Sequence, residues 1–450
     1  MDMRRNNWLT LLVIPGMLLL SLALVQSTRA LAVPSLTPLE QLGKFLFFDE
    51  NLSKNGNQSC ATCHDPAVGY SGPDSAINAH GAVYPGSDPA LFGNRKPPAA
   101  AYAGDSALLR YDEGPGGWIG GMFWDGRATG EALGDPLAEQ AKGPFLNPLE
   151  QALTSPEELC SKVEAGSYAA LFDQVWGAGA LDCAEAETVY DQIGLAVAAY
   201  ERSWEVNPYS SKFDQFWDKA KAKRLDVTKI TTGNYTKYRN LGLTTTELYG
   251  LAMFNDPGYA NCASCHSLQP GSKGYPLFTD YSYDNLGLPA NPENPFYANL
   301  AYNPDGAAWV DTGLGGYLAS IGDPSAPEQM GKMKVPTLRN VDKRPSAGFV
   351  KAYGHNGSLK SLEDVVRFYI SQGMMGGMGG GMGGGGMGGG GMGGGGMGGG
   401  GMGGGGMCGG MMFGEPEVNE NLATLNHFPC RDRSYIVSFL KTLTDGYFQR

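Results

Sequence analysis

The fold is decided by the stretch Thr37-Pro-Leu-Glu40-Gln-Leu-Gly43-Lys-Phe-Leu-Phe47, which is followed by Cys60-Ala-Thr-Cys63-His64. The same pattern returns later as Thr244-Thr-Thr-Glu247-Leu-Tyr-Gly250-Leu-Ala-Met-Phe254, followed by Cys262-Ala-Ser-Cys265-His266. Thr, Glu, Gly and Phe stand at identical offsets in the two copies. A Thr followed three residues later by Glu is typical of the capping box that starts a helix. We therefore expect two related domains in tandem.

The remaining pattern predicts a mainly α protein with long loops. Helical periodicity is clear over 184–206, 361–371 and 433–443, whereas strand-like alternation is scarce and Gly, Pro and Asn mark many loops. We expect an N-terminal domain over 33–220 and a C-terminal domain over 221–450.

Charge and composition exclude two classes of protein. The chain of 450 residues has a formal net charge of -12, so it lacks the basic footprint that a nucleic-acid binder needs. Hydrophobic residues make up 42% of the chain, which is enough for a sizeable core and excludes disorder over most of it. An acidic surface favours basic partners, if there are any.

The N-terminus resembles a secretory signal peptide. Arg4 and Arg5 precede an apolar run over 8–25, and small residues follow at Ala30-Leu31-Ala32. We expect residues 1–32 to be removed and the mature protein to be periplasmic or otherwise exported. An uncleaved membrane anchor is the alternative, but the interrupted run is at the lower limit for a bilayer span.

The two Cys-x-x-Cys-His motifs predict two covalently bound haem c groups. Two thiols at this spacing can add to the vinyl groups of one haem, and the adjacent imidazole then becomes the proximal iron ligand. A zinc site needs four ligands, and a redox dithiol has no need of the His, so both alternatives are weaker. The expected cofactor-binding residues are Cys60, Cys63, His64, Cys262, Cys265 and His266.

The four remaining cysteines form two pairs that are close in sequence. In an exported protein we prefer disulfides between Cys160 and Cys183 and between Cys408 and Cys430. Connectivity cannot be derived from the sequence alone.

An ordered set of further motifs resembles the bacterial di-haem cytochrome c peroxidases and their relative MauG, the methylamine-utilisation enzyme that oxidises side chains of another protein. The resemblance covers most of 36–370 and the last twenty or so residues. The motifs are Phe47-Phe-Asp-Glu-Asn-Leu-Ser53, Phe123-Trp-Asp-Gly-Arg-Ala128, Gln140-Ala-Lys-Gly-Pro144, Asn147-Pro-Leu-Glu150, Lys334-Val-Pro-Thr-Leu-Arg-Asn340, His355-Asn-Gly-Ser358 and Val365-Val-Arg-Phe-Tyr369.

The resemblance implies two tandem cytochrome c-like haem domains, and it implies distinct roles for the two haems. The haem on His64 would react with peroxide, and the haem on His266 would transfer electrons. Trp124 matches the family tryptophan between the haems, and Gln140 and Glu150 match the pair in the distal pocket. Glu150 would move a proton from one peroxide oxygen to the other. Without the motifs, Trp124 would be a core aromatic residue and Glu150 a surface carboxylate.

Two further residues are candidate axial ligands. His80 stands sixteen residues after His64, where the peroxidases keep a removable distal histidine, but an insertion over 84–121 favours an exposed loop histidine as the alternative. Tyr369 stands fourteen residues after His355, where MauG-like proteins have a Tyr and typical peroxidases a Met. A phenolate ligand stabilises ferric iron and lowers its potential, and a buried core Tyr is the alternative.

Calcium and copper are weaker expectations than the two haem groups. The interhaem calcium of the family is doubtful, because Arg95 or Lys96 stands where relatives have an Asn ligand. Residues 373–414 comprise 29 Gly, 11 Met, one Cys and one Phe, a composition that predicts an unstructured insertion. Its thioethers could bind Cu(I) or act as targets for peroxide, and a repeat without function is the alternative.

Taken together, the motifs predict a di-haem peroxidase that reduces hydrogen peroxide at the N-terminal haem. Its electrons would come through the C-terminal haem from a small cytochrome c or a cupredoxin. A MauG-like enzyme that oxidises Trp or Tyr of a partner protein is the second possibility. A non-catalytic electron-transfer cytochrome is the third, although it leaves Gln140 and Glu150 without a task. Oligomeric state cannot be predicted, and a dimer is possible.

Overall fold

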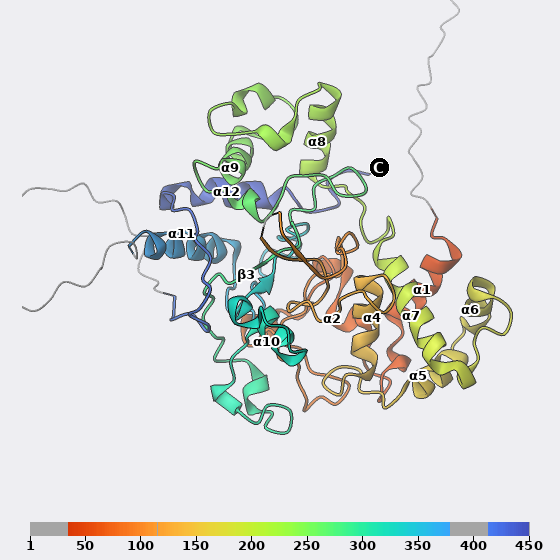
Figure 1. Cartoon of the computed structure of the whole chain (residues 1–450). Coiled ribbons are helices and arrows are strands. Elements are labelled where there is room, and N and C mark those ends of the chain that lie inside the picture. Colours follow the sequence, from red (N-terminus) through yellow and green to blue (C-terminus); the bar gives the residue numbers. More distant parts are fainter. Residues whose placement is uncertain (1–34, 115, 379–412, 450) are drawn as a thin grey trace, which may run out of the picture. The chain divides into compact units, whose positions relative to one another are not determined.

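The computed structural model describes residues 35–114, 116–378 and 413–449, with the side chains of 373–378 left out. These described residues belong to one compact unit that is mainly helical, as predicted (Figure 1). Its helices are α1 Pro38–Phe48, α2 Cys60–Cys63, α3 Ser75–Ala79, α4 Pro136–Leu146, α5 Pro156–Glu164, α6 Ala169–Trp176, α7 Ala186–Glu201, α8 Lys212–Ala222, α9 Thr245–Asn255, α10 Gly313–Ser320, α11 Leu362–Met378 and α12 Arg433–Lys441. Across these described ranges, no helix is long and apolar enough to cross a membrane.

The sheet content is confined to two short antiparallel pairs in the described ranges. Strands β1 (Arg110–Asp112) and β2 (Gly117–Ile119) pair with Arg110 opposite Ile119. Strands β3 (Tyr283–Asp284) and β4 (Met333–Lys334) pair with Tyr283 opposite Lys334. The first pair lies within the insertion recognised in the sequence, and the second lies beside the C-terminal haem motif.

Both predicted capping boxes are present. Thr37 Oγ1 accepts a hydrogen bond from the Glu40 amide, and the Glu40 carboxylate accepts one from the Thr37 amide at 2.7 Å. Thr244 and Glu247 repeat the arrangement at the start of α9. The duplicated sequence therefore starts α1 and α9 by the same local interaction.

The repeated glycine explains how each of these helices packs. A β-carbon on Gly43 of α1 would collide with the backbone carbonyl of Ala196 in α7. A β-carbon on Gly250 of α9 would collide in the same way with the carbonyl of Tyr435 in α12. Glycine thus allows the backbones of two helices to touch in both halves of the chain. The predicted helices over 184–206 and 433–443 are the crossing partners, α7 and α12.

Two hydrophobic cores surround the two helix pairs. The first gathers buried side chains of α1, α4, α5 and α7, and the second gathers those of α8, α9, α11 and α12. The proposed boundary at residue 220 falls within α8, whose Phe213 and Phe216 belong to the second core. Arg339, which is fully buried, joins the halves: it forms two 2.8 Å hydrogen bonds to Asp214 and lies over the ring of Tyr102.

Three further sequence predictions concern the disulfides, the Met/Gly segment and the signal peptide. The disulfide between Cys160 and Cys183 is confirmed. Cys408 lies outside the described residues, so the second predicted disulfide remains a prediction. Helix α11 continues to Met378 and includes the first six residues of the Met/Gly segment, whereas most of that segment, and the predicted signal peptide, lie outside the described ranges.

Candidate functional site

The first Cys-x-x-Cys-His motif forms the short helix α2. The Ser59 amide donates to Thr62 Oγ1 at 3.0 Å, and the His64 amide donates to the Cys60 carbonyl at 2.9 Å. The His64 ring donates from Nδ1 to the carbonyl of Tyr70 at 3.2 Å. Burial lowers the pKa of His64 to about 4, so the imidazole is neutral at physiological pH. Its Nε2 atom is the ring nitrogen left for a metal.

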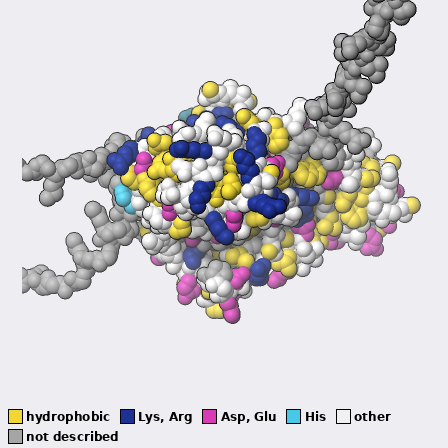
Figure 2. Space-filling view, turned by 90° about the horizontal axis from the view of Figure 1, so that it is seen from above, with side chains coloured by type: hydrophobic (Ala, Val, Ile, Leu, Met, Phe, Trp, Pro, Cys, Tyr) yellow, Lys and Arg dark blue, Asp and Glu magenta, His cyan; other side chains and the backbone are white. Residues whose placement is uncertain are grey.

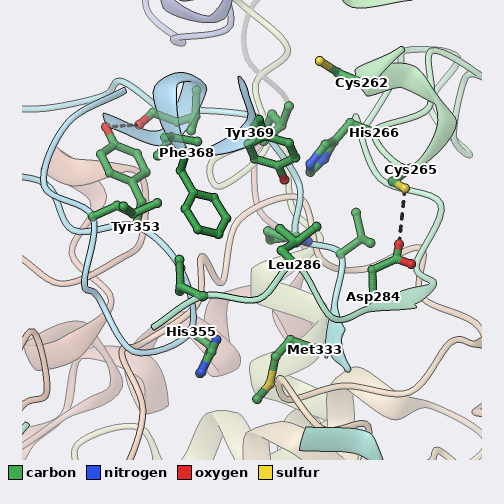
Figure 3. Close-up of a pocket in the computed structure, with 18 of the residues that line it drawn as sticks. Cys262, Cys265, His266, Asp284, Leu286, Met333, Tyr353, His355, Phe368 and Tyr369 are labelled. Atoms are coloured by element: carbon green, nitrogen blue, oxygen red, sulfur yellow. Dashed lines mark hydrogen bonds between the residues drawn. The ribbon is translucent and has the colours of Figure 1, made fainter. Parts of the chain in front are cut away.

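The second motif repeats this arrangement in a 3-10 turn, Cys262–Ser264. The His266 amide donates to the Cys262 carbonyl at 2.9 Å, and His266 Nδ1 donates to the carbonyl of Phe278 at 3.0 Å. Cys265 donates from Sγ to Asp284 Oδ2 at 3.2 Å (Figure 3). Burial lowers the pKa of His266 as well.

The four motif cysteines are free thiols rather than disulfides. Burial raises the pKa of Cys63, Cys262 and Cys265 to about 12, and it also raises the pKa of Cys60. Each motif therefore presents two protonated thiols and one neutral imidazole. This donor set fits a haem attached by two thioether bonds and one axial nitrogen.

A cavity of about 410 Å³ adjoins the second motif and supports the same conclusion. Its lining is mostly apolar, and its volume lies in the range of roughly 300–1,000 Å³ found for cofactor sites. Figure 3 shows the cavity with His266 and Tyr369 on one side and Met333 and His355 on another. The second motif thus has both the donors and the space that a haem requires.

Tyr369 reaches this cavity from α11. Ser361 caps the helix by accepting a hydrogen bond from the Asp364 amide at 3.1 Å. The phenol lies beside the His266 ring (Figure 3), while the neighbouring Phe368 is fully buried in the second core. Burial, with Cys262, Cys265 and Asp284 nearby, raises the pKa of Tyr369 well above its usual value. The phenol therefore keeps its proton at neutral pH unless a cation replaces it.

Glu150 lies close to the first motif. It follows α4, and the side-chain amide of Asn147 donates to Glu150 Oε2 at 2.7 Å. Burial raises the pKa of this carboxyl group, and its charge in turn raises the pKa of Cys63. Gln140 is half-buried on α4 and makes no side-chain hydrogen bond to a described residue. The structure therefore brings Glu150 to the first motif, whereas no described residue forms a hydrogen bond with the Gln140 side chain.

Trp124 is held between segments that are distant in sequence. Its side chain is 8% exposed, and Nε1 donates to the Lys96 carbonyl at 2.9 Å. The Lys334 amide donates to the Trp124 carbonyl at 2.8 Å. The indole lines the same cavity as His266, and its ring centre is 6.4 Å from that of His355. Both halves of the chain thus determine where this tryptophan lies.

A buried network of charges adjoins Trp124. Arg95 donates to Asp125 at 2.6 Å and to both oxygens of Asp311 at 2.6 and 2.7 Å. The guanidinium group holds the pKa of Asp311 at about 2, below its ordinary 3.8, despite burial. In the residues that the structure describes, no cluster of three or more His, Cys, Asp or Glu side chains could hold a metal ion.

His355 completes this network. Its Nε2 atom is buried, lies 3.6 Å from Glu417 Oε2 and 4.0 Å from Asp311 Oδ2, and has no hydrogen-bond partner within the described ranges. Glu417 also accepts a hydrogen bond from the Asp311 amide at 3.0 Å. Sequence reasoning missed Asp311 and Glu417, because neither belongs to a motif and Glu417 follows the Met/Gly segment.

His80 lies at the surface. Its side chain is 71% exposed, and Nδ1 lies 3.2 Å from Glu293 Oε1. This arrangement is that of the exposed loop histidine considered as the alternative. Binding of His80 to the iron of the first haem stays a prediction, and it would require a conformation of His80 other than this one.

The chain is similar to known proteins in both sequence and structure. Residues 37–222 match the family model of the di-haem cytochrome c peroxidases. The chain is 33% identical over 344 residues to methylamine utilization protein MauG of Paracoccus denitrificans, covering 76% of each chain. It is 27% identical over 346 residues to cytochrome c551 peroxidase of Nitrosomonas europaea, covering 76% of this chain and 75% of the relative. The crystal structure of the diheme peroxidase BthA from Burkholderia thailandensis superposes with a TM-score of 0.65 at 28% identity, covering 93% of this chain and 88% of that one.

Proposed function

Because the chain belongs to the di-haem cytochrome c peroxidase and MauG family of oxidoreductases, we propose that it is an exported peroxidase that reduces hydrogen peroxide at its N-terminal haem site. Electrons would enter through the C-terminal site and pass Trp124. The observation that carries the proposal is Glu150, whose half-buried carboxyl group lies beside the first motif and has a raised pKa. An electron-transfer cytochrome has no use for such a group.

The chain's own residues would hold two haem c groups. Cys60, Cys63 and His64 form one site, and Cys262, Cys265 and His266 form the other. Haem bound there supplies the redox-active iron that peroxide reduction and electron transfer require. The Tyr70 and Phe278 carbonyls orient the two imidazoles by accepting a hydrogen bond from Nδ1.

Glu150 would handle the protons. Reduction of one hydrogen peroxide to two waters consumes two electrons and two protons. The carboxylate can accept a proton from one peroxide oxygen and return it to the other, and its raised pKa brings it closer to the pH at which it must do both. Asn147 holds Oε2, so the carboxyl group keeps one orientation.

A second function is favoured by Tyr369 alone. Its phenol faces His266 in the cavity, and a phenolate ligand lowers the potential of a haem. A phenolate would also stabilise oxidation states of the iron above ferric, which suits an enzyme that stores the oxidising equivalents of peroxide and then withdraws electrons from Trp or Tyr of a partner protein, as in the MauG-like alternative. His80 as a removable ligand and Cu(I) on the Met/Gly segment remain secondary proposals.

The test is Glu150→Gln in the holoprotein, with Glu113→Gln as the matched change at an exposed carboxylate. We expect roughly a hundredfold or greater slowing of the reaction with peroxide for Glu150→Gln, and spectra that match the wild type. Pyridine haemochrome analysis after acid acetone should find two haems per chain still attached. An unchanged rate would remove Glu150 from the site, and extractable haem would refute the attachment.

A further inference from the structure

One exposed surface of the chain is strongly basic. Residues 219–239, which begin in α8, contain a single exposed acidic residue, Asp226. The exposed basic residues, here named the basic face, are Lys219, Lys221, Lys223, Arg224, Lys229, Lys237 and Arg239. Figure 2 looks onto α8 from above and shows Lys and Arg side chains gathered across this surface. A protein with a net charge of -12 thus carries a local excess of positive charge.

Little of this charge is neutralised by neighbours. Lys229 forms an exposed ion pair with Asp226 at 3.3 Å, and Lys219 bonds to the uncharged Gln215. Among the described residues, Lys221 and Arg224 have no ion pair. Such a cluster produces a positive field that attracts a negatively charged partner before contact.

The basic face borders the core that packs against the second motif, because Trp217 and Ala220 of α8 are buried in the second core together with Phe278. The opposite side of α8 is buried, and Phe213 packs against Phe278 with ring centres 5.1 Å apart. Phe278 is the residue whose carbonyl accepts the His266 hydrogen bond at 3.0 Å. The loop of the basic face is also bonded to the segment that leads into the second motif, because the side-chain amide of Asn255 donates to the carbonyls of Thr228 and Ile230 at 3.0 and 2.8 Å. The basic face and the second haem site are therefore joined by a shared core and by direct hydrogen bonds.

We propose that the basic face docks an acidic redox protein that exchanges electrons with the His266 site. The inference rests on the proposed function and names the kind of partner that would deliver the electrons. Net charge alone suggested a basic partner, whereas the basic face favours an acidic one. Two one-electron donor molecules are oxidised for each peroxide reduced to water, and solvent supplies the two protons. Nearness to His266 favours a redox protein, because a nucleic acid or a lipid surface gains nothing from it.

The experiment compares two double variants of the holoenzyme with equal changes in charge. Lys221→Glu with Arg224→Glu reverses two charges on the basic face, and Lys54→Glu with Arg110→Glu reverses two exposed charges elsewhere. The donor is a reduced acidic blue copper protein, and a reduced basic cytochrome c serves as the opposite probe. Peroxide-dependent oxidation of each is followed at several salt concentrations.

With the acidic donor at low salt, we expect kcat/KM to fall about tenfold or more in the basic-face variant, with kcat retained at saturating donor. The control variant should change less than about twofold, and added salt should erase the difference. With the basic cytochrome c as donor, kcat/KM of the basic-face variant should rise rather than fall. Equal effects of both variants, or no salt dependence in the wild type, would overturn the proposal.

Failure of docking and failure of the proposed function are distinguishable. Hydroquinone, an uncharged small donor, reports peroxide turnover without docking, and both variants should use it as the wild type does. If the wild type does not turn over peroxide with hydroquinone, the proposed function fails. Titration calorimetry with the oxidised blue copper protein then still tests the docking surface. Binding of an oligonucleotide or of anionic vesicles at the basic face, without binding of the acidic protein, would refute the assignment.

Discussion

Asp311→Asn removes one charge from the buried network beside Trp124 and leaves the shape of the side chain nearly unchanged. Asp311 is 3% exposed and accepts two hydrogen bonds from Arg95. The residue next to Arg95 is Lys96, whose carbonyl holds the indole of Trp124. The substitution therefore tests whether this ion pair stabilises the region that positions the tryptophan.

The magnitude follows from the pKa of the carboxyl group. The difference between the ordinary 3.8 and about 2 corresponds to about 2.5 kcal/mol, at about 1.36 kcal/mol for each pKa unit. Because the folded-state pKa is lowered, this stabilisation is fully present above about pH 5 and is lost as pH falls through about 2. At pH 3 about 1.3 kcal/mol should remain.

The assay is urea denaturation of the holoprotein, followed by far-UV circular dichroism, at pH 7 and at pH 3. The free energy of unfolding of Asp311→Asn should lie about 2.5 kcal/mol below that of the wild type at pH 7, and the gap should narrow by about half at pH 3. Asp305→Asn, at an exposed carboxylate, is the matched control and should change stability by less than about 0.5 kcal/mol. A gap that is absent, or that does not depend on pH, would show that Arg95 does not stabilise the Asp311 charge.

Three further predictions follow from the same structure. Asp214→Asn leaves the buried Arg339 without its carboxylate and should lower the free energy of unfolding by about 3–5 kcal/mol in the same denaturation assay; a loss under about 1 kcal/mol would contradict a buried ion pair. Tyr369→Met should raise the midpoint potential of one haem in a redox titration, and the wild type should lack the sulfur-to-iron charge-transfer band; a band already present in the wild type would exclude Tyr369 as the ligand. Since burial raises the pKa of Glu150, stopped-flow rates of the peroxide reaction should fall as pH drops through that raised value, where the carboxylate gains a proton, and Glu150→Gln should abolish this dependence; a wild-type rate that does not change with pH would argue against a base.

Local interactions explain which features of the site were predictable. The capping boxes at Thr37 and Thr244 join residues three apart, and each Cys-x-x-Cys-His motif folds into a single turn. Ser361 likewise caps α11 through a residue three positions later. Such short patterns can be recognised in a sequence because only a few backbone conformations let their residues interact.

Long-range features were predictable only through the resemblance. Without the family motif, Glu150 would be read as an ordinary surface carboxylate. Only that motif placed it in the distal pocket of the first haem. His80 shows the limit of that reasoning, because its spacing from His64 matches the peroxidases while the structure places it beside Glu293 at the surface.

The sequence by itself determined the two haem motifs, the helices that precede them and the glycine that lets each helix cross its partner. Only the tertiary structure decided that Arg95 pairs with Asp311, 216 residues away, and that both halves hold Trp124. It alone showed that the basic segment is exposed and is bonded to the polypeptide that leads into the second motif. The physical reason is range: hydrogen bonds within a turn depend on neighbouring residues, whereas buried ion pairs and surface fields depend on segments that only folding brings together.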